Sequence, residues 1–70
     1  MQAVTLTPVQ LTNAQMGQPV ILNTGEELRA VPVEDGWKYF ISWGGMTGLI
    51  RYAPEGLDAA LWALNASDEV

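Results

Sequence analysis

Residues 37 to 52 read Trp37-Lys38-Tyr39-Phe40-Ile41-Ser42-Trp43-Gly44-Gly45-Met46-Thr47-Gly48-Leu49-Ile50-Arg51-Tyr52. Two runs rich in aromatic and β-branched residues flank a Gly-Gly pair, which is a strong signal for a two-residue hairpin loop. With Gly44 and Gly45 as the loop, Trp43 lies opposite Met46. The same register continues along both strands and pairs Ile41 with Gly48, Tyr39 with Ile50 and Trp37 with Tyr52. Side chains alternate between the two sides of a strand, so the stretch predicts an antiparallel hairpin with one nearly apolar side.

Gly48 has a specific place in this hairpin. In the predicted register it leaves room beneath the large side chains of Tyr39, Ile41 and Trp43. A glycine inside a strand is also typical of a β-bulge, which is the alternative interpretation.

The preceding strand repeats the pattern. Residues 27 to 33 are predicted to pair with residues 37 to 43 through an Asp35-Gly36 loop. The two registers agree in placing one set of residues on a common apolar side: Leu28, Ala30, Pro32, Trp37, Tyr39, Ile41, Trp43, Met46, Ile50 and Tyr52. The opposite side receives Val31, Phe40 and Leu49, bordered by Arg29, Lys38 and Arg51. The agreement of two independent turns predicts a meander.

The remaining segments complete the predicted fold. Residues 3 to 9 alternate Val4 and Leu6 with threonines, which predicts a strand that ends at Pro8 or lies at the edge of the sheet. Residues 10 to 18 are expected to form a loop and residues 19 to 23 a short strand. Residues 55 to 65 carry a leucine and alanine stripe at helical spacing. We therefore expect an α+β, mainly β domain: an antiparallel meander of four to five short strands with one C-terminal helix packed on the sheet. A curled, SH3-like partial barrel is the nearest architecture by analogy. We expect residues 1–70 to form a single domain, with residues 1–2 and 66–70 frayed.

Composition limits the functional classes. The chain has 70 residues, a formal charge of −5, no Cys and no His. Disulfides are impossible, a zinc site is disfavoured, and oligomerisation is the remaining support for so small a core. The acidic balance disfavours direct nucleic-acid binding and docking on anionic membranes. No apolar run spans a bilayer and no signal peptide is evident, which predicts a cytoplasmic protein of a bacterial cell or a virus-infected host cell.

Catalytic groups are scarce. Without His or Cys, the usual general base and the thiolate nucleophile are missing. Ser42 and Lys38 lie about 13 Å apart along a strand, too far to form a dyad. Carboxylates at Glu26-Glu27 and Glu34-Asp35 occupy turns, where acids are ordinarily solvated. We predict no catalytic, cofactor-binding or metal-binding residues.

Six residues are candidates for binding a partner protein: Arg29, Lys38, Phe40, Arg51, Asp58 and Trp62. The three cations and Phe40 form a binding face in one interpretation, a solvated sheet face in a second, and an interior covered by the N-terminal strands in a third. Trp62 lies away from the helical stripe of Leu57, Ala60, Leu61 and Leu64. A small domain gains from burying a Trp, so we expect either the N-terminal segment or another chain to cover Trp62, with another chain favoured.

Two functional hypotheses follow. The first is a small non-enzymatic protein-interaction module, homodimeric in one version. The alternative is a small acidic inhibitor, of the kind that phages encode, that occupies the basic surface of a nucleic-acid-handling protein machine. A contiguous apolar patch would favour the module and a contiguous acidic patch the inhibitor. A small enzyme is a third class and would need residues supplied by a partner.

Overall fold

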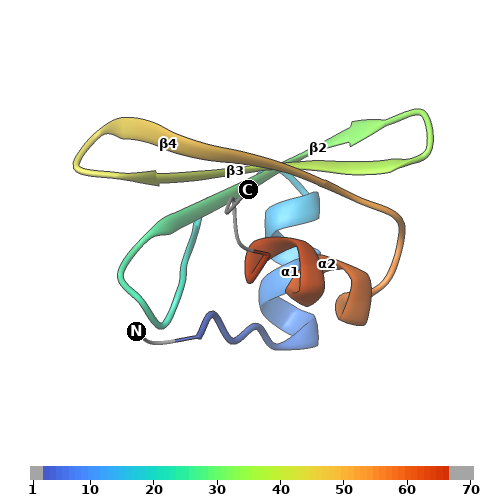
Figure 1. Ribbon diagram of the computed structural model, residues 1–70, viewed down its shortest axis with the longest axis horizontal. Coiled ribbons are helices and arrows are strands. Elements are labelled where there is room, and N and C mark those ends of the chain that lie inside the picture. Colours follow the sequence, from blue (N-terminus) through green and yellow to red (C-terminus); the bar gives the residue numbers. More distant parts are fainter. Residues whose placement is uncertain (1–2, 67–70) are drawn as a thin grey trace.

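The computed structural model describes residues 3–66 and has two layers (Figure 1). Its elements are α1 (Pro8–Gln15), β1 (Val20–Ile21), β2 (Glu27–Val33), β3 (Gly36–Trp43), β4 (Met46–Ala53) and α2 (Leu57–Leu64). The strands form one antiparallel sheet in the order β1-β2-β3-β4. Both helices lie on the same side of this sheet (Figure 1). The predicted α+β meander with a C-terminal helix is confirmed; the sheet stays open instead of curling into a barrel. The terminal residues predicted to be frayed lie outside the described residues, except Ala66, whose N–H donates to the Ala63 carbonyl at 3.2 Å.

The N-terminal prediction was wrong, because residues 8–15 form a helix and not a strand end followed by a loop. Thr7 starts this helix with a capping box: its hydroxyl accepts from the Gln10 N–H at 3.1 Å, and the Gln10 side chain accepts from the Thr7 N–H at 2.9 Å. Pro8 at the first helical position lacks the N–H that a helix start leaves unpaired. Leu11 and Ala14, three positions apart, turn toward the core and are buried.

Two asparagines hold the extended segment before α1. The Asn23 amide accepts from the Thr5 N–H and donates to the Ala3 carbonyl, both at 2.8 Å. The Asn65 amide accepts from the Val4 N–H at 2.8 Å and donates to the Val4 carbonyl at 3.1 Å. The segment is therefore held by side-chain amides, which satisfy its backbone without a neighbouring strand.

The β2–β3 hairpin differs from its predicted register by two positions. Val33 pairs with Gly36, Ala30 with Tyr39 and Leu28 with Ile41, so the two-residue loop is Glu34-Asp35 and not Asp35-Gly36. A shift of two residues leaves every side chain on its predicted side, because strand side chains have a period of two. The predicted sides of β2 and β3 are therefore correct.

The β3–β4 hairpin begins as predicted. Gly44 and Gly45 have φ of 58° and 80°, the positive values that a type I′ loop needs, and Trp43 pairs with Met46. Beyond Ser42 the register shifts, so that Ile41 pairs with Leu49. Gly48 is the extra residue of a bulge, which confirms the alternative interpretation. The predicted room beneath large side chains is confirmed for Trp43, whose indole lies where a Gly48 Cβ would be.

This one-residue shift exchanges the two sides of β4 after Gly48. Ile50 now lies opposite Phe40 and Tyr52 opposite Lys38, on the side away from the helices. Leu49 and Arg51 lie opposite Ile41 and Tyr39, on the helical side. The predicted places of Ile50 and Tyr52 in the core, and of Arg51 beside the other cations, were wrong for this reason.

The core fills the space between the sheet and the helices. Tyr39, Leu28 and Ile41 are its largest fully buried side chains. Ala14 of α1 and Ala60 of α2 have no exposed area. From the predicted stripe of α2, Ala60 and Leu64 are buried, while Leu57 and Leu61 pack against the core and stay partly exposed.

Gly36 and Gly48 permit two close contacts of different stiffness. A Cβ at Gly36 would collide with the backbone carbonyl of Ala53, whereas a Cβ at Gly48 would collide with the Trp43 indole. Backbone cannot rotate away, but the indole is 49% exposed and can swing into water.

We expect Gly36→Ala to lower the free energy of unfolding by about 2–3 kcal/mol and Gly48→Ala by about 1 kcal/mol, measured by chemical denaturation. The background Trp43→Ala serves as the control for the second change. In that background Gly48→Ala should have almost no effect, because the group that it displaces is gone. Equal effects of Gly48→Ala in both backgrounds would show that the indole does not determine the need for glycine.

Candidate protein-binding face

The sheet has one side that neither helix covers, which we call the outer face. Two rows of side chains cross it from β2 to β4. One row consists of Arg29, Phe40 and Ile50, and the other of Val31, Lys38 and Tyr52. Residues directly opposite each other in antiparallel strands lie within contact distance on a shared side, so the rows form a continuous surface.

Apolar side chains dominate the outer face and remain in water. Tyr52 is 64% exposed, Val31 45%, Ile50 44% and Val33 39%. Phe40 is half-buried between the two rows. Contiguous exposed apolar surface of this kind marks a site for binding a protein, a membrane or a ligand.

Lys38 sits at the centre of this surface. Its Nζ lies 5.1 Å from the centre of the Phe40 ring and 5.7 Å from the centre of the Tyr52 ring, which places the ammonium over two aromatic faces. No carboxylate among residues 3–66 is within ion-pair distance of Lys38. Arg29, by contrast, is paired with Glu27 at 2.7 Å. Lys38 is therefore the cation of the outer face that is available to a partner's carboxylate.

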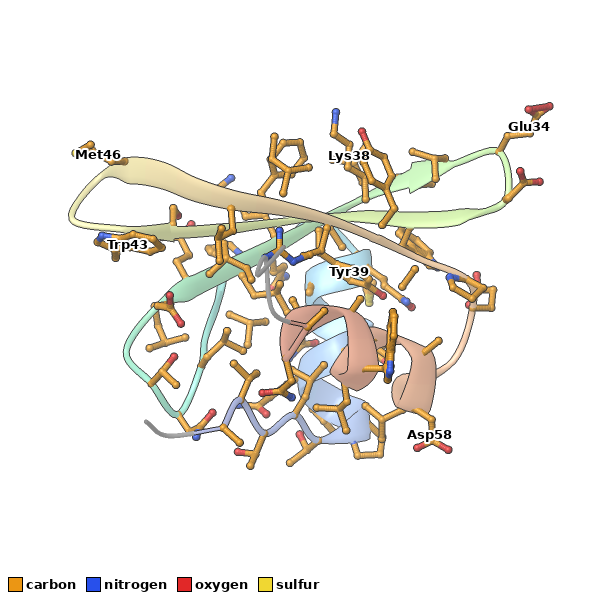
Figure 2. The ribbon with its side chains drawn as sticks, in the orientation of Figure 1. Glu34, Lys38, Tyr39, Trp43, Met46 and Asp58 are labelled. Atoms are coloured by element: carbon orange, nitrogen blue, oxygen red, sulfur yellow. The ribbon has the colours of Figure 1, made fainter. Side chains whose placement is uncertain are left out.

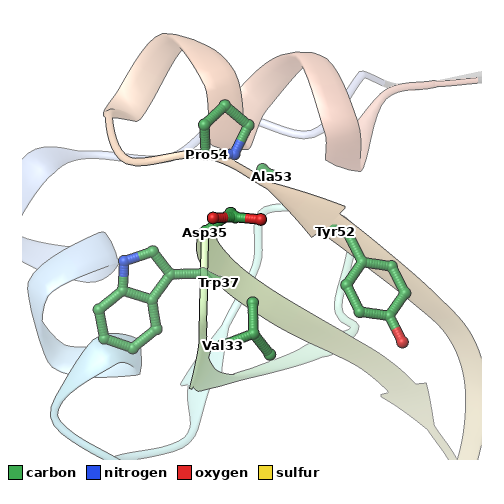
Figure 3. A pocket seen from close by; sticks show the side chains of 6 residues that line it. All are labelled: Val33, Asp35, Trp37, Tyr52, Ala53 and Pro54. Atoms are coloured by element: carbon green, nitrogen blue, oxygen red, sulfur yellow. The ribbon is translucent and has the colours of Figure 1, made fainter.

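A shallow groove of about 400 Å³ continues the outer face at the end formed by the β2–β3 turn. Its lining consists of Val33, Asp35, Trp37, Tyr52, Ala53 and Pro54 (Figure 3). In Figure 3 the rings of Trp37 and Tyr52 lie to either side of Val33, and the Asp35 carboxylate lies between Val33 and Pro54. Glu55 accepts a hydrogen bond from the Trp37 indole N–H at 2.7 Å, which fixes that ring. The groove therefore combines apolar walls with one carboxylate that can accept a hydrogen bond.

The predicted partner-binding residues fall into three places. Arg29, Lys38 and Phe40 share the outer face, as predicted. Arg51 lies on the helical side of the sheet, half-buried, and its guanidinium donates to the Ile50 carbonyl at 3.1 Å. Asp58 and Trp62 lie on α2, in the other layer.

The N-terminal segment does not cover Trp62, which is 76% exposed. That half of the expectation for Trp62 was wrong. The other half, coverage by another chain, stays a prediction.

The groove itself was missed by the sequence reasoning. Tyr52 was assigned to the core by the register without a bulge, and Val33, Asp35 and Pro54 received no role. The available signal was Gly48, because a glycine within a strand pattern indicates a bulge that reverses the sides of the residues after it.

Neither a metal centre nor a membrane span is found in the described part of the chain. No group of three or more acidic, His or Cys side chains that could hold a metal ion occurs among residues 3–66. No helix in that range is long and apolar enough to cross a bilayer.

Comparison with known proteins yields no relative: no family model matches the chain, and no curated protein or solved structure matches it significantly. The outer face and the groove are therefore interpreted from their own chemistry.

Tyr39 is a buried tyrosine on the helical side of the sheet, opposite the outer face. Burial raises the pKa of its phenol above the ordinary value of 10.0; the hydrogen bond from Gln15, at 3.4 Å, lowers the pKa and the Glu55 charge raises it. Tyr39 has no exposed area, so its role is to fill the core.

The raised pKa of Tyr39 makes stability depend on alkaline pH. Above about pH 10 the unfolded chain loses the phenolic proton while the folded chain keeps it, so the unfolded state is favoured as pH rises. We expect the free energy of unfolding to fall by up to about 1.4 kcal/mol per pH unit in this range. Tyr39→Phe should reduce the fall and the control Tyr52→Phe, at an exposed site, should not; denaturant titrations between pH 8 and 11 measure both. Identical profiles for the two variants would contradict the assignment.

Proposed function

We propose that this domain is a non-enzymatic protein-binding module that receives its partner on the outer face. The observation that carries the proposal is the uncovered side of the sheet, where Val31, Ile50 and Tyr52 are exposed together in adjoining rows. Burying apolar surface contributes about 25 cal/mol per Å². A partner that covers the two rows removes their apolar surface from water, which favours binding.

Lys38 supports the proposal by giving the apolar surface a polar centre. A charged group among apolar side chains limits which partners bind and in which orientation. A partner that places no carboxylate near Lys38 would leave the ammonium desolvated and unpaired. The two rings beside Lys38 hold its side chain in place before a partner arrives.

The absence of His and Cys from the sequence supports a binding role over a catalytic one. Ser42 and Lys38 are both on the outer face, four positions apart on β3, which keeps them from acting as a nucleophile and its base. We propose that their place on the face is for contact with a protein.

Affinity capture from the native host with immobilised wild-type protein tests the binding role. Ile50→Glu places a charge among the apolar side chains of the outer face, at the β4 end of a row, and Val9→Glu is the matched control at an α1 site that is 68% exposed. We expect Ile50→Glu to lose a captured protein that the wild type and Val9→Glu both retain. The affinity of the purified pair should fall by about thirtyfold or more, because a buried glutamate would replace an apolar contact.

Circular dichroism and denaturation of both variants establish that each is folded. Retention of every captured protein by folded Ile50→Glu would contradict binding through the outer face.

The acidic inhibitor is the second candidate, and the distribution of carboxylates favours it. Glu34 and Asp35 form the β2–β3 turn, and Glu55 and Asp58 lie beside the start of α2. Figure 2 labels Glu34 and Asp58 at the same end of the molecule, away from Trp43 and Met46. An acidic end of this kind can face a basic protein surface.

Ionic strength distinguishes the two candidates. Binding through the acidic end should weaken steeply between about 0.05 and 0.5 M salt, because screening shortens the reach of exposed charges. It should also weaken in the variant Glu34→Gln with Asp35→Asn, and Ile50→Glu should leave it unchanged. The reverse pattern, with weak salt dependence and sensitivity to Ile50→Glu, supports the outer face.

A further inference from the structure

Asp58 and Trp62 form an exposed pair on α2 that the outer face does not account for. The Trp62 side chain is 76% exposed, and Asp58 is exposed as well. Residues four apart on a helix share one side, with Cβ atoms about 5–6 Å apart. The pair therefore presents an indole and a carboxylate side by side, and we call it the α2 knob.

The groove offers the groups that such a knob needs. An indole is a flat apolar ring with a single N–H donor. The groove supplies apolar walls from Val33, Tyr52 and Pro54 and one acceptor, the Asp35 carboxylate. The Trp37 indole N–H is already bonded to Glu55, so it does not compete for Asp35.

Lys38 supplies the charge beside the groove. Its ammonium lies 5.7 Å from the ring of Tyr52, which lines the groove. Residues four apart on a helix share one side, so a helix that seats an indole against Tyr52 can carry a carboxylate one turn away toward Lys38.

We propose that the groove binds the Trp62 side chain of a second copy of this chain, with Asp58 of that copy paired to Lys38. This inference rests on the proposed function, of which it names one partner. The indole fills the groove and donates to Asp35, and the carboxylate of the knob meets the cation that has no carboxylate partner among residues 3–66.

The Asp58–Lys38 pair favours this contact over a symmetric one. A two-fold pairing of outer faces would bring Lys38 of one copy toward Lys38 of the other. A two-fold pairing of knobs would likewise bring the two Asp58 side chains together. Like charges in an interface oppose association. The knob-and-groove contact pairs Asp58 with Lys38, against the repulsion of Glu34 and Asp35 in the turn beside the groove. Because knob and groove are different surfaces, the contact is heterologous, and copies add head to tail or close into a ring. Each copy carries −5, so association requires enough salt to screen that repulsion, about 0.15 M.

Sedimentation velocity on the purified chain tests the contact. The wild type should form species larger than a monomer as its concentration approaches about 1 mM. Trp62→Ala, which removes the knob, and Tyr52→Ala, which removes a groove wall, should each stay monomeric. Val9→Ala, at a site that is 68% exposed on α1, should behave as the wild type.

Mixing the two variants gives the decisive result. Trp62→Ala keeps its groove and Tyr52→Ala keeps its knob, so an equimolar mixture should form a 1:1 dimer that grows no further. A mixture that stays monomeric while the wild type associates would overturn the knob-and-groove contact, as would association of either variant alone.

A charge exchange guards against a variant that has lost its fold. Asp58→Lys and Lys38→Glu should each weaken association at least tenfold, and their mixture should recover it, because the intact Asp58 of one variant meets the intact Lys38 of the other and the new lysine meets the new glutamate. Failure of the mixture to recover would contradict the Asp58–Lys38 pair. If the wild type is monomeric up to about 1 mM, the second copy is not the partner. The outer face can still be supported in that case, by capture that is lost in Ile50→Glu.

Discussion

The extra residue at Gly48 is the constraint on which the surface of this protein depends. It lets the Trp43 indole lie against the β4 backbone, and it reverses the sides of every β4 residue that follows. Leu49 thereby joins the core, while Ile50 and Tyr52 reach the outer face. Without the bulge, the apolar side chains would gather on the helical side and the outer face would carry Leu49 and Arg51 in their place. The bulge therefore builds an exposed apolar surface from a strand whose alternation would otherwise bury it.

The helical layer explains why that surface stays uncovered. Each helix has only eight residues, and the buried residues of both helices pack on the same side of the sheet. Helix α1 contributes Leu11 and Ala14, and α2 contributes Ala60, Ala63 and Leu64. Residues 3–66 form no further helix or strand that could cover the second side. A single core in so small a domain supplies little stability, so a partner on the outer face would also stabilise the fold.

The sequence predicted the parts of the fold that local rules determine. The Gly44-Gly45 loop and the two sides of β2 and β3 follow from turn chemistry and strand alternation. The register error of two residues in the β2–β3 hairpin left every side chain on its predicted side. The bulge was harder, because Gly48 suits both a regular strand under large side chains and an extra residue. Helix α1 was missed since Val4 and Leu6 alternate like a strand, although Thr7, Pro8 and Gln10 carry the capping signal. For the candidate site, Lys38 and Phe40 could be placed together from β3 alone. Tyr52 could not, because its side depends on the bulge. Trp62 stood out from its helical position, but the lack of cover from the N-terminal segment depended on where that segment packs.

The two asparagine amides imply an order of events in folding. Both hairpins join residues close in the chain, so they can form early with little loss of loop entropy. The amide of Asn65 holds Val4 across 61 positions, and that of Asn23 holds Thr5 across 18. The Asn65 closure becomes favourable only when the sheet and α2 are in place, which makes the docking of the N-terminal segment a late step. Interactions that form after the folding transition state affect the unfolding rate more than the folding rate. We therefore expect the hydrogen bonds of the two asparagine amides to slow unfolding, and the hairpins to determine the folding rate.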